Sequence, residues 1–144
     1  MSSLDDFAIR VEPTGAPLDG WGNAVPILHE VLHALRRLAG SGESTVIDVK
    51  SLPFGPGDEE QLLEALGSGE VHATVDALGE TRVRETRYPG AWLVDHYNVE
   101  GERIAFHIEI AEIPQILRSQ PEDVAAGLRR LETDLAGRSD ENDA

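Results

Sequence analysis

The sequence contains no cysteine among its 144 residues. This absence excludes a disulfide framework, a thiol nucleophile, and any zinc ion or iron–sulfur cluster held by thiolates of this chain. We therefore expect no cofactor. Any redox-active centre connected with the protein is expected to belong to a partner.

Long hydrophobic runs are also absent. No stretch approaches the ~20 apolar residues that a membrane-spanning helix needs. Residues 1–6, MSSLDD, have neither the basic n-region nor the apolar h-region of an export signal. The sequence thus predicts a cytoplasmic protein without a membrane partner.

Basic residues are scarce, because 12 Lys and Arg stand against 27 Asp and Glu and give a formal net charge of −15. Such a field repels phosphate backbones and anionic lipids, so nucleic acids and membrane surfaces are poor partners. The same field favours a basic partner or peptide segment, although solubility alone also explains an acidic surface.

Apolar residues, by contrast, are plentiful and ordered. They make up 40% of the chain and recur with the periods of helices and strands, so the chain should fold. Its length suits one domain without disulfides or metal. We predict a flexible N-terminal arm at residues 1–23, where Pro and Gly are dense, a single α+β domain at residues 24–137, and a disordered acidic tail at residues 138–144.

Periodicity and turn residues place the elements of this domain. Helical segments are predicted at residues 24–38, 58–66, 113–119 and 121–136, with Gly40 and Gly67 ending the first two. Strands are predicted at residues 45–52, 71–77, 81–87, 92–98 and 103–111, the last four at hairpin spacing. The predicted fold is α+β, an antiparallel β-meander with helices packed on one face.

One pentapeptide suggests metal chemistry. His29, Glu30 and His33 match the H-E-x-x-H pattern, in which two histidines one helical turn apart bind zinc and the glutamate acts as general base. On this hypothesis the protein is a zinc-dependent hydrolase, with His29 and His33 as ligands and a third protein ligand still to be found. Against it, the apolar stripe of the helix leaves both histidines outside, beside Arg36 and Arg37, and no third-ligand extension follows.

The other three histidines, His72, His96 and His107, fall in predicted strands. A histidine on the solvent face of a sheet is most often a tolerated polar residue. These three would share a metal or proton-transfer site only if the strand register brought them together. We assign them no catalytic role.

A group of aromatic residues, Tyr88, Trp92 and Tyr97, surrounds one predicted hairpin. Tyr and Trp are favoured anchors of protein interfaces, although a strand Trp more commonly packs in the core. Residues 88–90 form a predicted loop tip. The candidate partner-binding residues are therefore Tyr88, Pro89, Gly90, Trp92 and Tyr97.

Several short strings occur in one order between residues 25 and 131, after the helix that carries His29 and Glu30. They are Thr45-Val46-Ile47-Asp48, Leu52-Pro53, Gly55-Pro56-Gly57-Asp58, Leu66-Gly67, Gly69-Glu70-Val71, Arg84-Glu85-Thr86, Tyr88-Pro89-Gly90-Ala91-Trp92 and Ile113-Pro114. In this combination the chain resembles the conserved C-terminal domain of the HupH/HyaF hydrogenase-expression proteins.

The resemblance implies an accessory factor for the maturation of nickel–iron uptake hydrogenases. Such a factor is a chaperone and not an enzyme, and is thought to bind the precursor of the iron–sulfur small subunit before assembly and export. The resemblance implies no zinc chemistry in the His29–His33 helix. Many relatives carry a further domain of similar size, so either a homodimer or another protein would complete the binding unit.

Overall fold

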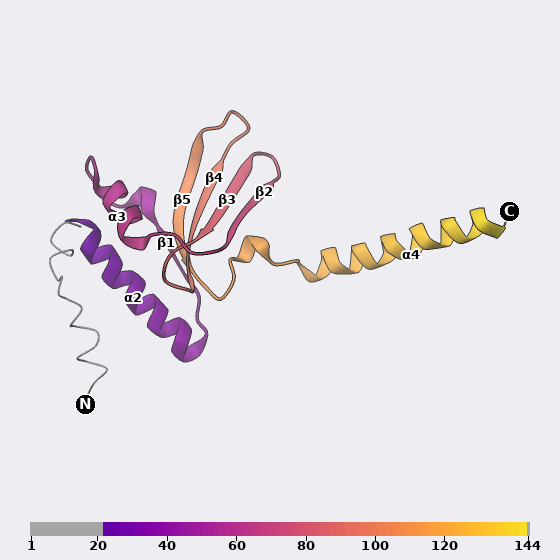
Figure 1. Ribbon diagram of the computed structural model, residues 1–144, viewed down its shortest axis with the longest axis horizontal. Helices are drawn as coiled ribbons and strands as arrows, with labels where there is room; N and C mark the ends of the chain where they lie inside the picture. Colours follow the sequence, from indigo (N-terminus) through magenta and orange to yellow (C-terminus); the bar gives the residue numbers. More distant parts are fainter. Residues whose placement is uncertain (1–21, 144) are drawn as a thin grey trace. The chain divides into compact units, whose positions relative to one another are not determined.

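The structure, a computed structural model, describes residues 22–143. In chain order its elements are α2 (Ala24–Ser41), β1 (Thr45–Asp48), η2 (Val49–Ser51), α3 (Asp58–Leu66), β2 (His72–Asp76), β3 (Glu80–Glu85), β4 (Ala91–Tyr97), β5 (Arg103–Ile110), η3 (Gln115–Leu117) and α4 (Pro121–Asp143) (Figure 1). The predicted N-terminal arm, apart from Gly22 and Asn23, lies outside the described residues. No helix among the described residues is long and apolar enough to cross a bilayer.

The five strands form one antiparallel sheet in the order β1-β5-β4-β3-β2. Strands β2 to β5 follow one another as a meander. Strand β1 comes from earlier in the chain and pairs with β5, which places Ile47 opposite Ile108. This arrangement confirms the predicted α+β fold and its antiparallel meander.

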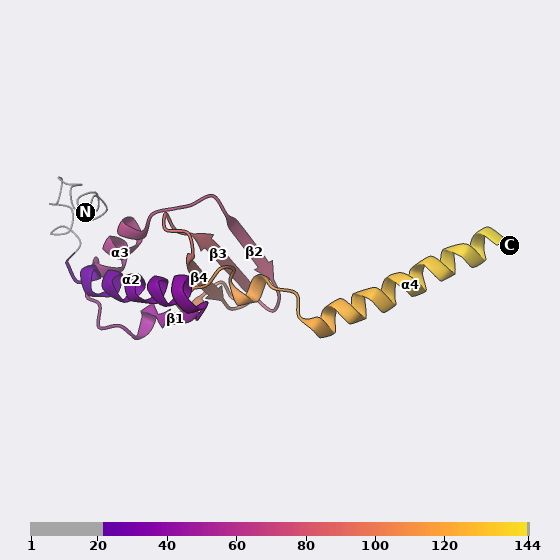
Figure 2. The same cartoon turned by 90° about the horizontal axis from the view of Figure 1, so that it is seen from below.

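Helices α2 and α3 cover one face of this sheet (Figures 1 and 2). Apolar residues recur along α2 at helical spacing and along the strands at every second position, so each element offers one apolar face. The shared core contains Ala24, Ile27, Val31, Ala34, Leu62 and Leu66 from the helices and Ile47, Ala91, Leu93, Phe106, Ile108 and Ile110 from the strands. Burial of each large side chain contributes about 1.5–3 kcal/mol.

Helix α2 ends later than predicted. Gly42, and not Gly40, is the C-cap, with φ of 80° and an N–H that donates to the carbonyl of Leu38 at 2.9 Å. A left-handed C-cap favours a residue without Cβ, and both glycines meet that requirement. Periodicity therefore predicts a glycine stop without deciding which glycine provides it.

The predicted strand at residues 45–52 is wrong beyond Asp48. The Asp48 side chain accepts a hydrogen bond from the Lys50 N–H at 3.1 Å and starts the short helix η2. A capping carboxylate of this kind offers the backbone an alternative to the sheet ladder. Local hydrogen bonding thus overrides the β propensity of Val49.

The described residues divide into two compact units, one ending at Pro114 and the other beginning at Gln115, where the sequence predicts a single domain at residues 24–137. The second unit consists of η3 and α4. Helix α4 starts at Pro121, as predicted, but continues through residues 138–143, for which the sequence predicts a disordered tail. The apolar stripe of α4 is 56% to 60% exposed at Val124, Leu128, Leu131 and Leu135.

Candidate functional site

An apolar groove of about 250 Å³ lies between α2 and the turn that carries Tyr88. Its walls are Val25, Leu28, His29, Val31, Leu32, Leu35, Leu66 and Tyr88. Leu32 is 42% exposed and Tyr88 is 39% exposed. Large apolar side chains that stay accessible around a concave surface are typical of a binding site for an apolar segment.

Backbone hydrogen bonds fix the position of Tyr88. The Tyr88 N–H donates to Thr86 Oγ1 at 3.0 Å, and the Ala91 N–H donates to the Tyr88 carbonyl at 2.9 Å. Gly90, at φ of 98°, closes this turn directly over α2, since a Cβ at this position would lie 3.2 Å from Leu35 Cδ2. The predicted loop tip is therefore a tight turn held against the helix.

The segment after α3 completes the groove by bringing Leu66 beside the Tyr88 turn. The Arg87 N–H donates to the Leu66 carbonyl at 2.8 Å, and the Gly69 N–H donates to the Glu85 carbonyl at 2.7 Å. At Gly69 an added Cβ would lie 2.5 Å from the Thr86 carbonyl oxygen. Only glycine lets these two segments approach so closely.

Trp92 and Pro89 differ in their accessibility. Trp92 is only 6% exposed, and its indole N–H donates to the Ala111 carbonyl at 3.0 Å. Pro89 lies in the turn and is exposed. Trp92 thus stabilises the sheet beside the Tyr88 turn, while Tyr88 and Pro89 are the accessible members of the candidate set.

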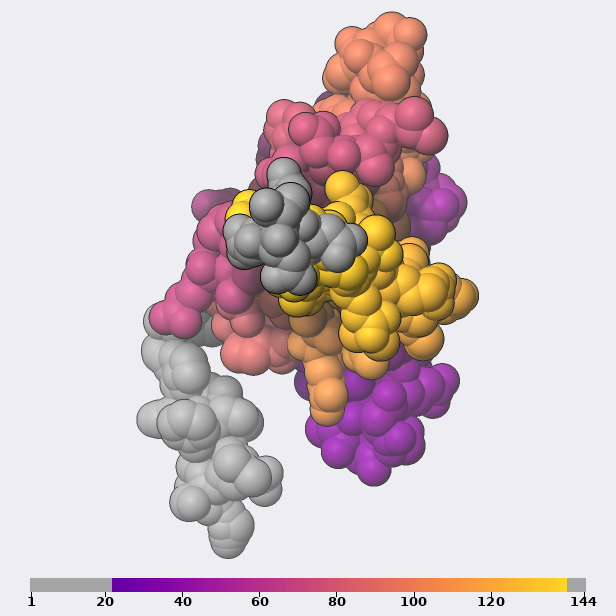
Figure 3. Space-filling model, turned by 90° about the vertical axis from the view of Figure 1, so that its right-hand side faces the viewer, coloured from indigo at the N-terminus to yellow at the C-terminus, as the bar shows by residue number. Residues whose placement is uncertain are grey.

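Tyr97 lies at the other end of β4, about 20 Å from the Tyr88 turn at ~3.3 Å per strand residue. It lines a separate polar hollow of about 370 Å³ together with Asp76, Glu80 and Arg82. The Arg82 guanidinium lies 4.7 Å from the centre of the Tyr97 ring. Beyond Tyr97, the turn of residues 98–102 projects from the end of the sheet (Figure 3). Tyr88 and Tyr97 therefore belong to two different surfaces, and Trp92 belongs to neither.

The histidines of the zinc-like pentapeptide are on the surface of α2. His29 and His33 are both exposed, and His29 contributes to the rim of the apolar groove. Among the described residues, no three His, Asp or Glu side chains are arranged to hold a metal ion. The helix therefore supplies two neighbouring histidines, and no third ligand joins them within residues 22–143.

Two strand histidines do come together. His96 and His107 lie on the same face of neighbouring strands, with ring centroids 5.4 Å apart, whereas His72 is on β2, two strands from β4. Thr81 Oγ1 lies 2.8 Å from His96 Nδ1. Burial, and then the proximity of His96, lower the pKa of His107 below its usual value. The pair is a packed polar contact within the sheet.

Three leucines of the groove, Leu28, Leu32 and Leu35, belong to the apolar stripe of α2. Leu28 and Leu35 do pack against the core, but they also face the groove, and Leu32 is open to solvent. Leu28, Leu32 and Leu35 lie at helical spacing on one side of α2, and this pattern alone does not distinguish a buried face from a groove wall.

Comparison with known protein families decides what kind of protein carries this groove. The model of the family described as "HupH hydrogenase expression protein, C-terminal conserved region" matches residues 22–136. The chain belongs to the HupH family of hydrogenase expression proteins. The match includes α2, the Tyr88 turn and the whole sheet, so both groove walls lie within the family's conserved region.

Individual relatives agree with this assignment. The chain is 35% identical over 115 residues to the hydrogenase expression/formation protein HoxQ of Azotobacter vinelandii, covering 78% of this chain and 41% of HoxQ. It is 26% identical over 115 residues to the hydrogenase-1 operon protein HyaF of Escherichia coli, covering 80% of this chain and 40% of HyaF. The chain thus spans about two fifths of the length of these curated relatives.

A solved structure gives the same result for the fold. The hydrogenase expression protein HupH from Thiobacillus denitrificans superposes with a TM-score of 0.76 at 40% sequence identity. The superposition covers 81% of this chain and 97% of that one. The α+β architecture described above is therefore also that of a HupH protein.

Proposed function

We propose that the protein is an accessory factor for the maturation of a nickel–iron uptake hydrogenase and that it acts by binding, not by catalysis. The observation that carries this proposal is family membership over residues 22–136, together with relatives named as hydrogenase expression and formation proteins. The open apolar groove supports a binding role. The client would be the precursor of the iron–sulfur small subunit, met in the cytoplasm before assembly and export.

We propose that the groove between α2 and Tyr88 receives an apolar segment of this precursor. An export signal combines a basic n-region with an apolar h-region of about 7–15 residues. The groove offers apolar walls, and the net charge of −15 favours the basic part. An export signal would thus match both the apolar walls of the groove and the negative charge of the protein.

The absence of cysteine supports the same client. Thiolates bind iron and zinc and exchange with disulfides, so a cysteine-containing chaperone would compete for the client's metal or form mixed disulfides with it. This chain has no thiol. It can therefore hold a cysteine-rich subunit without entering its chemistry.

We also propose that two copies of the chain act together on one client. A second copy would double the number of grooves available to one client. Binding at two linked sites strengthens an association without any new kind of contact.

Affinity purification of the tagged chain from its native host, under anaerobic conditions, tests the client. We expect mass spectrometry to identify the small-subunit precursor, and we expect the Leu32→Ser/Tyr88→Ser variant to lose it. Leu78→Ser is the matched control, because Leu78 is 96% exposed in the β2–β3 turn and lies outside the groove. An expressed hydrogenase that leaves no precursor in the eluate would overturn the proposal.

A peptide titration separates the two parts of the recognition. Fluorescence anisotropy would follow a labelled peptide with the precursor's basic and apolar regions. We expect affinity to fall with added salt, which screens the charge, and to fall in the Leu32→Ser/Tyr88→Ser variant, which removes apolar contact. Equal binding of a peptide whose apolar region is replaced by Ser and Gly would exclude the groove as its site.

A further inference from the structure

Strand β2 (His72–Asp76) forms one edge of the sheet and pairs with β3 alone among the described elements. The residues just outside the strand show which backbone groups this pairing uses. The Glu85 N–H donates to the Val71 carbonyl at 2.9 Å, and the Ala77 N–H donates to the Gly79 carbonyl at 2.9 Å. The odd-numbered residues of this strand therefore face β3.

Hydrogen-bonding direction alternates along an antiparallel strand, so the N–H and C=O groups of His72, Thr74 and Asp76 point away from β3. Within residues 22–143, no hydrogen bond reaches these outward groups. The three side chains are exposed as well. An edge of this kind is a ready template for another strand.

The sequence of β2 is complementary to itself when it is read in the opposite direction. If Thr74 is placed opposite Thr74 of a second copy, His72 meets Asp76 and Ala73 meets Val75. A Thr–Thr pair and an apolar pair are both favourable across antiparallel strands, and the His72 imidazole N–H can donate to the Asp76 carboxylate. The same register sets outward-facing residues opposite each other, so about six main-chain hydrogen bonds can form.

The neighbouring strand β3 reinforces this match. Arg84 lies opposite His72, and Glu80 lies opposite Asp76. One end of the β2–β3 pair therefore carries His72 and Arg84 on this face, and the other end carries Asp76 and Glu80. A two-fold axis through Thr74 places the His72 and Arg84 end of each copy beside the Asp76 and Glu80 end of the other.

We propose that the protein forms a homodimer by antiparallel pairing of β2 with β2 of a second copy, centred on Thr74. The two five-stranded sheets then become one continuous sheet. The net charge of −15 on each chain opposes association. The dimer is therefore reversible and depends on protein concentration.

The other edge of the sheet fits this role less well. Strand β1 has four residues and passes directly into η2, whereas β2 has five residues, no bulge in its register with β3, and neither Pro nor Lys. Pro, Lys and bulges are the usual devices that prevent an edge strand from pairing. An unrelated extended peptide could form the same main-chain hydrogen bonds with β2. It would lack the side-chain complementarity that a second copy of β2 offers.

Sedimentation equilibrium of the full chain tests the dimer, with an expected rise from 15.6 kDa toward twice that mass as concentration increases. His72→Asp places two carboxylates opposite each other and should abolish the dimer. The charge-exchanged variant His72→Asp/Asp76→His keeps the composition of the wild type and should restore it. Thr74→Pro removes an outward N–H and should raise the dissociation constant about tenfold or more, without breaking the β2–β3 ladder.

Hydrogen exchange at single residues distinguishes the occupants of this edge. The amides of His72, Thr74 and Asp76 should be protected only at concentrations at which the dimer forms, while those of Ala73 and Val75 are protected throughout. Protection of all five amides in the dilute monomer would mean that residues 1–21 of the same chain occupy the edge, and would overturn the proposal.

A dimer that tolerates Thr74→Pro, or a monomer at every accessible concentration, would also overturn it. These measurements need no hydrogenase component. Their failure would leave the proposed maturation function untouched, and failure to recover the small subunit would leave the dimer untouched.

Discussion

Single glycines set the geometry beside the candidate groove. Gly69 runs against the backbone at the end of β3, where a Cβ would lie 2.5 Å from the Thr86 carbonyl oxygen and 2.6 Å from Glu85 Oε1. The N–H groups on either side of this carbonyl are bonded, Thr86 N–H to the Ala91 carbonyl at 3.1 Å and Arg87 N–H to the Leu66 carbonyl at 2.8 Å. Because the carbonyl cannot move without disturbing these bonds, we expect Gly69→Ala to reduce the free energy of unfolding by about 1–3 kcal/mol. Urea denaturation monitored by circular dichroism measures this loss.

Gly40 provides the matched control, because it lies within α2 and a Cβ there meets nothing within 4 Å. Alanine is about 0.5–1 kcal/mol more favourable than glycine inside a helix, so Gly40→Ala should stabilise the protein. If both substitutions were equally harmless, the close approach at Gly69 would not be a constraint on the fold.

The half-buried His107 of β5 makes the stability of the protein depend on pH, and the direction of that dependence follows from its pKa. Burial and the charge of His96 lower the pKa of His107, while Glu109, Asp48 and Asp95 act weakly in the opposite direction. The unfolded chain therefore takes up a proton at a higher pH than the folded chain does. The stabilisation is complete above the ordinary value of 6.5 and is lost as the pH falls from there through the lowered pKa.

We expect the free energy of unfolding to fall less between pH 7 and pH 5 in His107→Gln than in the wild type, because glutamine cannot take up the proton. Urea titrations at the two pH values measure this difference. An NMR titration of His107 in folded and urea-unfolded protein is the direct check. Equal pKa values in the two states would contradict the proposed coupling.

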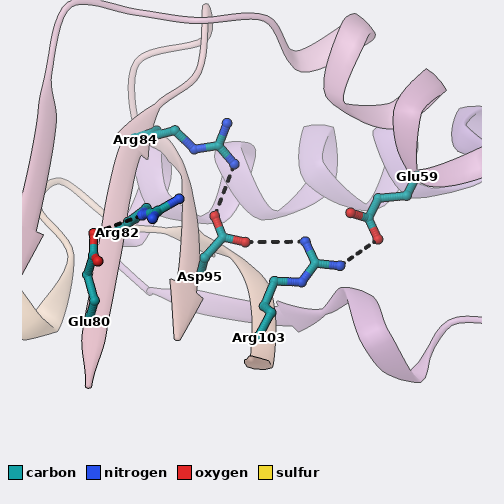
Figure 4. A network of polar contacts seen from close by, with 6 residues as sticks. All are labelled: Glu59, Glu80, Arg82, Arg84, Asp95 and Arg103. Carbon is teal, nitrogen blue, oxygen red and sulfur yellow. Dashed lines mark hydrogen bonds and ion pairs between the residues drawn. The ribbon is translucent and has the colours of Figure 1, made fainter. Parts of the chain in front are cut away.

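Between elements, one buried carboxylate connects the sheet with α3. Asp95, whose side chain is 4% exposed, accepts hydrogen bonds from Arg84 at 3.0 Å and from Arg103 at 3.4 Å (Figure 4). Arg103 also donates to Glu59 of α3 at 2.9 Å. The chain of contacts thus runs from β3 through β4 and β5 to the helix.

Asp95→Asn should lower the free energy of unfolding by about 1–3 kcal/mol, since it removes the charge that both arginines approach. The estimate is below that for a fully buried pair because the arginine side chains are 38% and 29% exposed. Glu80→Gln is the control, since its pair with Arg82 is on the surface (Figure 4). Equal urea midpoints for both variants would mean that the network contributes nothing to stability.

Element prediction succeeded where a periodic run had firm ends. Helix α3 begins at Asp58 and ends at Leu66 before Gly67, as predicted, because acidic residues suit its first turn and Gly67 ends it. Strand β1 was overestimated because Asp48 caps η2. The groove could not be predicted at all, since it requires Leu66 and Tyr88 to meet across hydrogen bonds that no local pattern encodes.

On the scale of the whole molecule, the folding core lies entirely in the first unit. No residue between Gln115 and Ser139 is buried, whereas the core residues run from Ala24 to Ala111. We therefore expect a chain ending at Pro114 to keep cooperative unfolding and the near-ultraviolet circular dichroism of Trp92. Its far-ultraviolet helix signal should decrease by the contribution of α4.

Thermal unfolding of the shortened and full chains provides the comparison. A shortened chain that unfolds without cooperativity would mean that residues 115–144 are required for the core. The Gly137→Ala variant of the full chain is a useful control, because a Cβ there meets nothing within 4 Å, and it should strengthen the α4 signal alone.

The sequence by itself determined the family, the fold class and most elements, because periodicity, glycine stops and short ordered strings are local properties of the chain. The composition alone shows that the chain has no thiol and that its net charge is negative. Tertiary structure alone decided that Trp92 is buried while Tyr88 stays accessible, that Tyr97 belongs to a different surface, and that β2 is left at the edge of the sheet. These outcomes depend on which segments pair and at what register, and pairing is settled by contacts between residues far apart in the sequence.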